Sequence, residues 1–131
     1  RIDEAIAVGV DPGSIIVDPG LGFSKNAEHN WQLLSALDAF STLDHRLLVA
    51  ASRKRFIASL LSPDDPKQAE QAAKDQATAT ISAISAQAGA WAVRVHDPAT
   101  SAVACKVIAA VREHSAAANP AADFGPDGAG R

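Results

Sequence analysis

Three short apolar segments, each ending in polar residues and followed by a helical pattern, limit the fold of this chain most strongly. The segments are 14–17, 47–51 and 91–95. The middle segment is a continuous apolar run, as found in strands that are buried on both faces of a parallel sheet. Successive β–α units imply a parallel sheet with right-handed crossovers. The sequence therefore predicts an α/β fold with its polar chemistry at the carboxyl ends of the strands.

Helical patterns precede, separate and follow these strands. They cover residues 1–8, 26–40, 53–61 and 67–88, with a final helix from Asp97 at the N-cap and Pro98 at the first position. Ser52 is the expected N-cap of the third helix. The alanine-rich fourth helix is expected to pack on two sides, where its neighbour could be a second subunit. Val103, Val107 and Val111 form an apolar stripe on the final helix.

Composition excludes several classes of protein. The net charge of -3 argues against a general nucleic-acid binder, which needs a basic face. No apolar run reaches the ~18 residues of a membrane span, and no signal peptide is visible. The single cysteine, Cys105, rules out a disulfide within the chain and is expected to be a packed, inert thiol. A cytoplasmic protein is the expectation.

Two observations predict that the chain is a piece of a longer protein. It contains no methionine, and Arg1 to Ile6 has the pattern of a helix interior. The three predicted strands leave both sheet edges open and cannot close a barrel, which needs eight. Residues 1–115 are predicted to be the folded part. From 116 onward Ala, Asn, Pro, Gly and Asp dominate, which predicts a disordered tail over 116–131.

Polar residues at the three strand ends are the candidate site. Asp18, in Asp-Pro-Gly, could accept two N–H bonds from a planar ligand, bind a metal, act as a base, or simply form a turn. Ser52, Arg53 and Lys54 could form an anion site or be a cap followed by solvated cations. Arg94 and His96 alternate along a strand and therefore share a side, facing a ligand or forming a structural pair.

Neighbouring parallel strands lie about 4.8 Å apart, so their ends should bring these residues into one pocket. Gly22 and Lys25, in the loop after the first strand, would let backbone and an ammonium approach a ligand there.

Four motifs together resemble the dihydropteroate synthase family. These are Asp18-Pro-Gly-Leu-Gly-Phe-Ser-Lys25, Ser52-Arg-Lys-Arg-Phe56, Asp75-Gln-Ala-Thr-Ala79 and Arg94-Val-His-Asp97. Their order and spacing agree with that family over residues 1 to about 114, most closely with actinobacterial members. The resemblance implies the last three β/α units of a TIM (β/α)8 barrel, incomplete on its own.

The resemblance also implies a reaction. Family members join 6-hydroxymethyl-7,8-dihydropterin diphosphate to p-aminobenzoate, releasing pyrophosphate with the help of Mg²⁺, and they form homodimers through their last helices. Lys54, Arg94 and His96 would be catalytic. The implied substrate-binding residues are Asp18, Gly22, Phe23, Lys25, Ser52, Arg53, Lys54, Arg94 and His96. No metal ligand is expected within this chain, because the family's Mg²⁺ site lies in its amino-terminal part.

The sequence departs from the family at the expected pterin site, where Ala50 replaces the usual glycine and could crowd the ring. Two alternatives therefore stay open. One is a non-catalytic pterin-binding or dimerising homologue. The other is the pterin-binding domain of a methyltetrahydrofolate methyltransferase, against which the diphosphate-binding cations argue. Because half of the site that the resemblance implies lies outside this chain, the isolated chain is expected to have little or no synthase activity.

Overall fold

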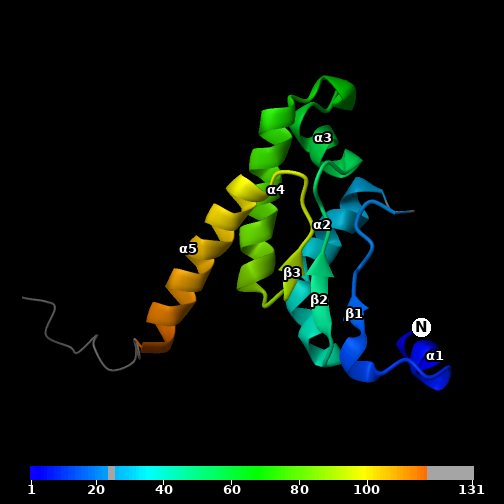
Figure 1. Cartoon of the computed structure of the whole chain (residues 1–131). Coiled ribbons are helices and arrows are strands. Elements are labelled where there is room, and N and C mark those ends of the chain that lie inside the picture. Colours follow the sequence, from blue (N-terminus) through cyan, green and yellow to red (C-terminus); the bar gives the residue numbers. More distant parts are fainter. Residues whose placement is uncertain (24–25, 118–131) are drawn as a thin grey trace, which may run out of the picture.

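A parallel sheet forms the centre of the molecule. The computed structural model describes residues 1–23 and 26–117. Strands β1 (Ile16–Val17), β2 (Arg46–Val49) and β3 (Ala92–Val93) lie side by side in chain order, as Figure 1 shows. Ile16 pairs with Arg46, and Leu48 pairs with Ala92. The predicted α/β fold is confirmed. In the part of the chain that the structure describes, the sheet has three strands and no closed barrel.

The strands are shorter than the sequence predicts. Residues Pro12–Ser14 form a 3-10 turn (η1), which delays the start of β1. Around β3 the pairing continues for one residue on each side. There the Trp91 N–H donates to the Leu47 carbonyl at 2.8 Å and the Arg94 N–H donates to the Val49 carbonyl at 2.9 Å. The side chain of Arg94 thus begins where the sheet ends.

The first helices agree partly with the sequence pattern. α1 (Ile2–Ala7) is followed by Gly9, whose φ of +96° suits glycine at a helix end. α2 (Ala27–Ser35) is capped by Asn26, whose side chain accepts a hydrogen bond from the His29 N–H at 2.8 Å. The prediction of one helix to residue 40 was wrong. Ala36 leaves the helical conformation, and a 3-10 helix, η2 (Leu37–Leu43), follows.

Three further helices complete the described chain. They are α3 (Arg55–Leu61), α4 (Gln71–Gln87) and α5 (Pro98–Ala117). α4 begins later than predicted because η3 (Pro66–Gln68) forms a separate 3-10 turn, with the Asp65 carboxylate accepting from the Lys67 N–H at 3.1 Å. α5 extends to Ala117, and the rest of the predicted tail, 118–131, lies outside the described residues.

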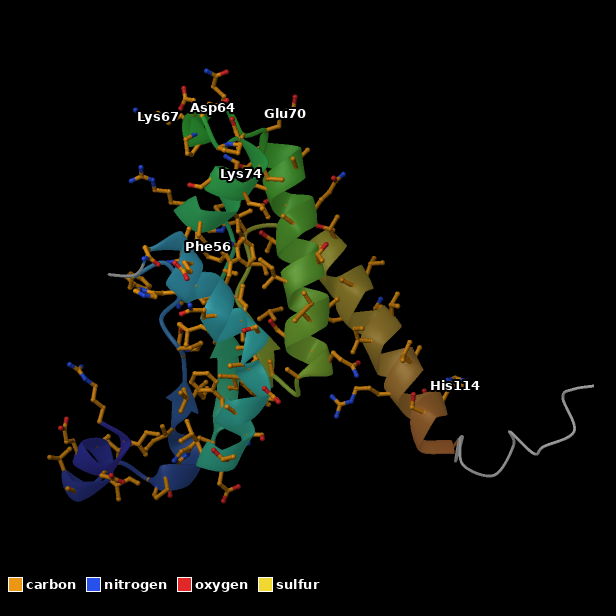
Figure 2. The ribbon with its side chains drawn as sticks, turned by 180° about the vertical axis from the view of Figure 1, so that it is seen from behind. Phe56, Asp64, Lys67, Glu70, Lys74 and His114 are labelled. Atoms are coloured by element: carbon orange, nitrogen blue, oxygen red, sulfur yellow. The ribbon has the colours of Figure 1, made fainter. Side chains whose placement is uncertain are left out.

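The hydrophobic core lies between the sheet and the helices beside it. Its buried members are Leu21, Leu34, Leu37, Leu47, Val49, Ala51, Phe56, Ile57 and Ile81. Phe56, labelled in Figure 2, meets the ring of Trp31 edge to face at 4.9 Å between centroids and so joins α3 to α2. This packing fixes the start of α3 relative to the strand ends.

α5 packs along α4, which separates it from the sheet (Figure 1). Four buried hydroxyl residues, here called the hydroxyl cluster, belong to these two helices: Thr78, Ser82 and Ser85 on α4, and Ser101 on α5. The valine stripe of α5 is exposed instead, at 61% for Val103, 57% for Val107 and 50% for Val111. Small side chains let the two helices approach, while the larger apolar ones point away. No helix of residues 1–23 and 26–117 is both long and apolar enough to cross a membrane.

Candidate active site

A cavity of about 210 Å³ opens just beyond the carboxyl ends of β2 and β3. It is lined by Ala50, Ser52, Lys54, Arg94, Val95 and His96. Each of these residues lies in the segment that follows its strand, as expected for a parallel sheet. The structure therefore brings together Lys54 and Arg94, which were predicted at the second and third strand ends. Ala50 forms part of the wall and is itself buried.

Asp18, at the end of β1, joins this group through Arg94. An Arg94 guanidinium nitrogen lies 3.4 Å from Asp18 Oδ2. The other carboxylate oxygen, Oδ1, accepts a hydrogen bond from the Gly20 N–H at 2.8 Å. Each carboxylate oxygen has two lone pairs, so Asp18 retains capacity for further donors. Its side chain is 31% exposed and that of Arg94 is 63% exposed, which leaves both accessible to a ligand.

Ser52 and His96 connect the second strand end to the third. The His96 N–H donates to Ser52 Oγ at 3.2 Å, and His96 Nδ1 lies 2.9 Å from the same oxygen. The Ser52 hydroxyl has one hydrogen and two lone pairs, so it can donate to Nδ1 or accept from it, depending on the tautomer of the ring. In both tautomers Nε2 is the ring nitrogen that Ser52 does not contact.

The predicted capping role of Ser52 was wrong. α3 begins at Arg55 with Lys54 in the N-cap position, and no side chain caps it. Arg53 adopts a φ of 58°, in the left-handed region that a non-glycine residue rarely enters. This reversal separates Ser52 from the helix and leaves its buried hydroxyl against His96.

Lys54 extends over the loop that follows β1. Its ammonium lies 3.8 Å from the centroid of the Phe23 ring, a cation–π contact. Its aliphatic stem lies against Gly22, where an added Cβ would be 2.7 Å from Lys54 Cδ. Gly22, at a φ of +75°, is therefore required by conformation and by space. Lys25, another predicted ligand, lies outside the described residues.

Arg53 faces another direction from the cavity. Its Nε lies 3.5 Å from Asp75 Oδ1 on α4, and the same carboxylate oxygen accepts from the Gln71 amide at 3.0 Å. The ion pair ties the loop between β2 and α3 to α4. A role of Arg53 in substrate binding stays a prediction.

Asn30 was missed by the sequence analysis. It is 1% exposed, accepts a hydrogen bond from the Gly22 N–H at 2.7 Å, and donates to the Asn26 carbonyl at 2.6 Å. A signal was present in the sequence, because Asn30 falls on the same helix face as Leu34 and Leu37. A polar residue on a predicted apolar face calls for a partner.

Asp97 caps the start of α5, as predicted. Its carboxylate accepts from the Thr100 hydroxyl and from the Ala99 N–H, the latter at 3.1 Å. The Thr100 hydroxyl contributes most to lowering the pKa of Asp97, and the Ala99 and Thr100 N–H groups and the Arg53 guanidinium add to it. Residues 1–23 and 26–117 contain no group of three His, Cys, Asp or Glu side chains that could hold a metal ion.

Comparison with known proteins agrees with this geometry. A family model described as pterin binding enzyme matches residues 1–96. The chain is 49% identical over 109 residues to a dihydropteroate synthase of Mycobacterium leprae, covering 83% of this chain and 38% of that protein. It is 41% identical over 107 residues to the corresponding Synechocystis protein, covering 82% and 35%. The chain thus spans well under half the length of these curated relatives.

Solved structures give the same result. The crystal structure of Yersinia pestis dihydropteroate synthase matches with a TM-score of 0.74 and 32% identity, over 86% of this chain and 50% of that one. The dihydropteroate synthase of Xanthomonas albilineans in complex with 7,8-dihydropteroate matches with a TM-score of 0.75 and 34% identity, over 86% and 40%.

Proposed function

The chain belongs to the pterin-binding enzyme family, and we propose that it is the carboxyl-terminal part of a dihydropteroate synthase. In the proposed reaction, the amino nitrogen of p-aminobenzoate forms a bond to the methylene carbon of 6-hydroxymethyl-7,8-dihydropterin diphosphate. The bond from that carbon to the diphosphate oxygen breaks, and its electron pair leaves with pyrophosphate. The amine gives up one proton to water.

The observation that carries this proposal is the convergence of Asp18, Lys54, Arg94 and His96 at one edge of the sheet. Asp18 offers a carboxylate to the amino and ring N–H groups of a pterin. The cations suit a reaction that expels a polyanion, since charge aimed at the leaving group stabilises the transition state. Arg94, held by Asp18, and the outward nitrogen of His96 are the proposed diphosphate contacts.

Phe23 and Lys54 are the proposed contacts to the aryl substrate. The ring of Phe23 is 59% exposed and lies under the Lys54 ammonium, so it offers a flat surface beside a cation. Ser52 is 5% exposed and holds His96, which favours a supporting role over direct contact with the p-aminobenzoate carboxylate. Gly22, which has no side chain, would let the backbone of this loop approach the ligand closely.

Mg²⁺ is part of the proposal, but the described residues do not fit a metal site by themselves, because they lack a cluster of suitable ligands. We therefore propose that its ligands belong to parts of the enzyme beyond this chain, and we assign no step to it here. We expect little synthase activity from this chain alone for the same reason. We also propose a cytoplasmic location, as expected for an enzyme of folate synthesis.

The exposed valine stripe of α5 supports a homodimer through α4 and α5. Val103, Val107 and Val111 recur every four residues along a 20-residue helix, and Ile84 of α4 is also 49% exposed. Beside Ile84, a largely apolar groove of about 470 Å³ runs between α2, α4 and α5. A second copy would present the same apolar stripe, so a two-fold contact could cover both.

The dimer can be tested with Val107→Asp, which places a charge in the centre of the stripe. We expect sedimentation velocity to show a dimer for the unchanged chain and a monomer for this variant. Lys106→Asp, on the neighbouring exposed position, is the matched control and should stay dimeric. Equal sedimentation of all three proteins would contradict the proposed interface.

The pterin site can be tested by calorimetric titration of 6-hydroxymethylpterin diphosphate with Mg²⁺ into the purified chain. We expect binding that is lost in Asp18→Ala. Asp64→Ala is the control, since Asp64 lies in the loop beyond α3, far from the strand ends (Figure 2). Binding that survives in Asp18→Ala would contradict the assignment. No binding by a folded chain would show that three strand ends are insufficient for the pterin.

The relatives favour a synthase over the methyltransferase alternative. The curated relatives and structures described above carry the name dihydropteroate synthase. The cations at the strand ends also suit an expelled diphosphate better than methyl transfer.

A further inference from the structure

We propose that Asn30 is a positioning residue for Lys54 and acts on it through Gly22. The significance for catalysis rests on the proposed function, because Lys54 is there a substrate-binding and catalytic cation. The contacts themselves do not depend on it. They form a chain from α2, through the loop after β1, to Lys54, the N-cap residue of α3.

The first step is the hold of Asn30 on the loop. Asn30 is 1% exposed, and both ends of its amide are used: Oδ1 accepts from the Gly22 N–H at 2.7 Å and Nδ2 donates to the Asn26 carbonyl at 2.6 Å. A buried amide with both partners satisfied can occupy one orientation, because rotation would leave like groups facing each other. Asn30 therefore fixes the position of the Gly22 backbone relative to α2.

The second step is steric. Three carbons of the Lys54 stem lie near the missing side chain of Gly22, with distances of 2.7 Å, 3.2 Å and 3.3 Å from an ideal Cβ to Cδ, Cγ and Cβ of Lys54. The stem thus lies directly on the Gly22 backbone. Moving this backbone toward the stem would displace Lys54, and moving it away would release the stem.

The third step is the direction of the ammonium. With its stem against Gly22, Lys54 places Nζ 3.8 Å from the Phe23 ring centroid. Lys54 also lines the cavity beyond the carboxyl ends of β2 and β3. The loop after β1 and the cavity are therefore joined by one side chain. By holding Gly22, Asn30 determines the position of the Lys54 ammonium between the Phe23 ring and the cavity.

A purely structural role for Asn30 makes a different prediction. In that case its loss lowers stability and affects all lysines alike. A positioning role affects Lys54 selectively, and it is retained by a substitution that keeps the acceptor for the Gly22 N–H.

The experiment measures acetylation rates of individual lysines in the intact chain by mass spectrometry, with melting temperature recorded for each variant. Asn30→Leu keeps the shape and removes both hydrogen bonds. Asn30→Asp keeps an acceptor for the Gly22 N–H, and its second carboxyl oxygen can donate to the Asn26 carbonyl when it is protonated. Gln32→Leu, on the exposed side of α2, is the matched control, and the exposed Lys67 and Lys106 are internal references.

We expect Asn30→Leu to raise the Lys54 rate about two- to fivefold, the factor that corresponds to losing a cation–π contact, with Lys67 and Lys106 unchanged. Asn30→Asp and Gln32→Leu should leave the Lys54 rate near that of the unchanged chain. Equal rates at Lys54 in every folded variant would overturn the proposal. So would a rise shared by all lysines.

Gly22→Ala approaches the same contact from the other side and from an exposed loop, so it gives an answer even where Asn30→Leu does not fold. We expect it to raise the Lys54 rate at least as much; an unchanged rate would overturn the proposal. In the full-length enzyme, Asn30→Leu should lower kcat/KM and Asn30→Asp should restore most of it. Because acetylation needs no substrate, failure of the proposed function would leave its result intact.

Discussion

Two polar regions of this molecule satisfy their hydrogen bonds in opposite ways. In the hydroxyl cluster of α4 and α5, each α4 hydroxyl donates to a carbonyl four residues earlier in its own helix: Thr78 to Lys74 at 2.8 Å, Ser82 to Thr78 at 2.9 Å and Ser85 to Ile81 at 2.7 Å. The contact between Ser82 and Ser101, at 3.3 Å, crosses between the helices. These groups are buried and have their partners close by in sequence.

At the strand ends, polar side chains find their partners across the sheet. Asp18 pairs with Arg94, and Ser52 contacts His96, although each pair is far apart in the sequence. Asp18 and Arg94 are also partly exposed, with lone pairs and N–H groups left over. Hydroxyl groups that hydrogen-bond within their own helix let two helices pack closely. Side chains whose hydrogen bonds across the strands are incomplete leave donors and acceptors for a ligand. The location of the partners therefore separates structural polar groups from candidate functional ones.

The strongest way to break this comparison is to remove one arginine from the strand ends and one from the contact between α4 and α5. In the full-length enzyme, we expect Arg94→Ala to reduce kcat/KM on the order of a hundredfold, because a charge aimed at the leaving group is lost. Arg112, which donates to the Ala86 carbonyl between α5 and α4 at 3.3 Å, is the matched control. Arg112→Ala should leave steady-state kinetics unchanged. Equal effects of the two substitutions would contradict the distinction.

The second prediction concerns the contact between α4 and α5, where a substitution should lower stability and leave ligand binding intact. Ser101 is 3% exposed against α4, so Ser101→Leu must overpack the helix contact. We expect the free energy of unfolding to fall by about 1–3 kcal/mol in urea titrations. Pterin binding by the folded protein should persist, since the strand ends are not involved. A variant of undiminished stability would show that α5 does not pack on α4 as described.

A smaller effect is expected when only a hydroxyl of the cluster is removed. In Ser82→Ala, the Thr78 carbonyl loses the hydroxyl, and the space left is small. We expect the free energy of unfolding to fall by no more than about 1 kcal/mol. A loss of several kcal/mol in the same titration would indicate that the link from Ser82 to Ser101 matters more than the bonds within α4.

The smallest prediction concerns Asp97, which lies between the two regions at the start of α5. Its pKa is lowered from the ordinary value of 3.8, so its charged form stabilises the fold. That contribution is complete above the unfolded pKa and is lost as the pH falls through the lower folded value. The stability difference from Asp97→Ala should therefore be constant near neutral pH and shrink in acid. Urea titrations at several pH values would show a widening difference in acid if this were incorrect.

Much of the candidate site could be predicted from the sequence, because parallel strands bring their carboxyl ends to one edge. Asp18, Lys54, Arg94 and His96 are gathered for that reason alone. The orientation of Ser52 could not be predicted in this way. It depends on the positive φ of Arg53, and an arginine gives no sign of such a backbone conformation in the sequence. Asn30 was overlooked because periodicity counts apolar residues and gives no account of a buried amide.

The exposed stripe of α5 shows a second limit. The spacing of Val103, Val107 and Val111 correctly indicates one apolar face. Periodicity alone does not indicate what covers that face. Against α4 lie the small residues Ser101 and Cys105, which both contact Ser82 and allow closer approach of the two backbones. The length of the 26–40 helix was overestimated because residues in a 3-10 helix can follow the same apolar spacing for one turn.

The order of the strands has a consequence for how the chain reaches its structure. β1, β2 and β3 are neighbours in the sheet in the same order as in the sequence. Each new strand can therefore pair with the strand made just before it, and the connecting helix can then pack against the pair. Among these three strands, such a chain can add one unit at a time during synthesis on the ribosome. Loop closures stay short, which favours rapid folding.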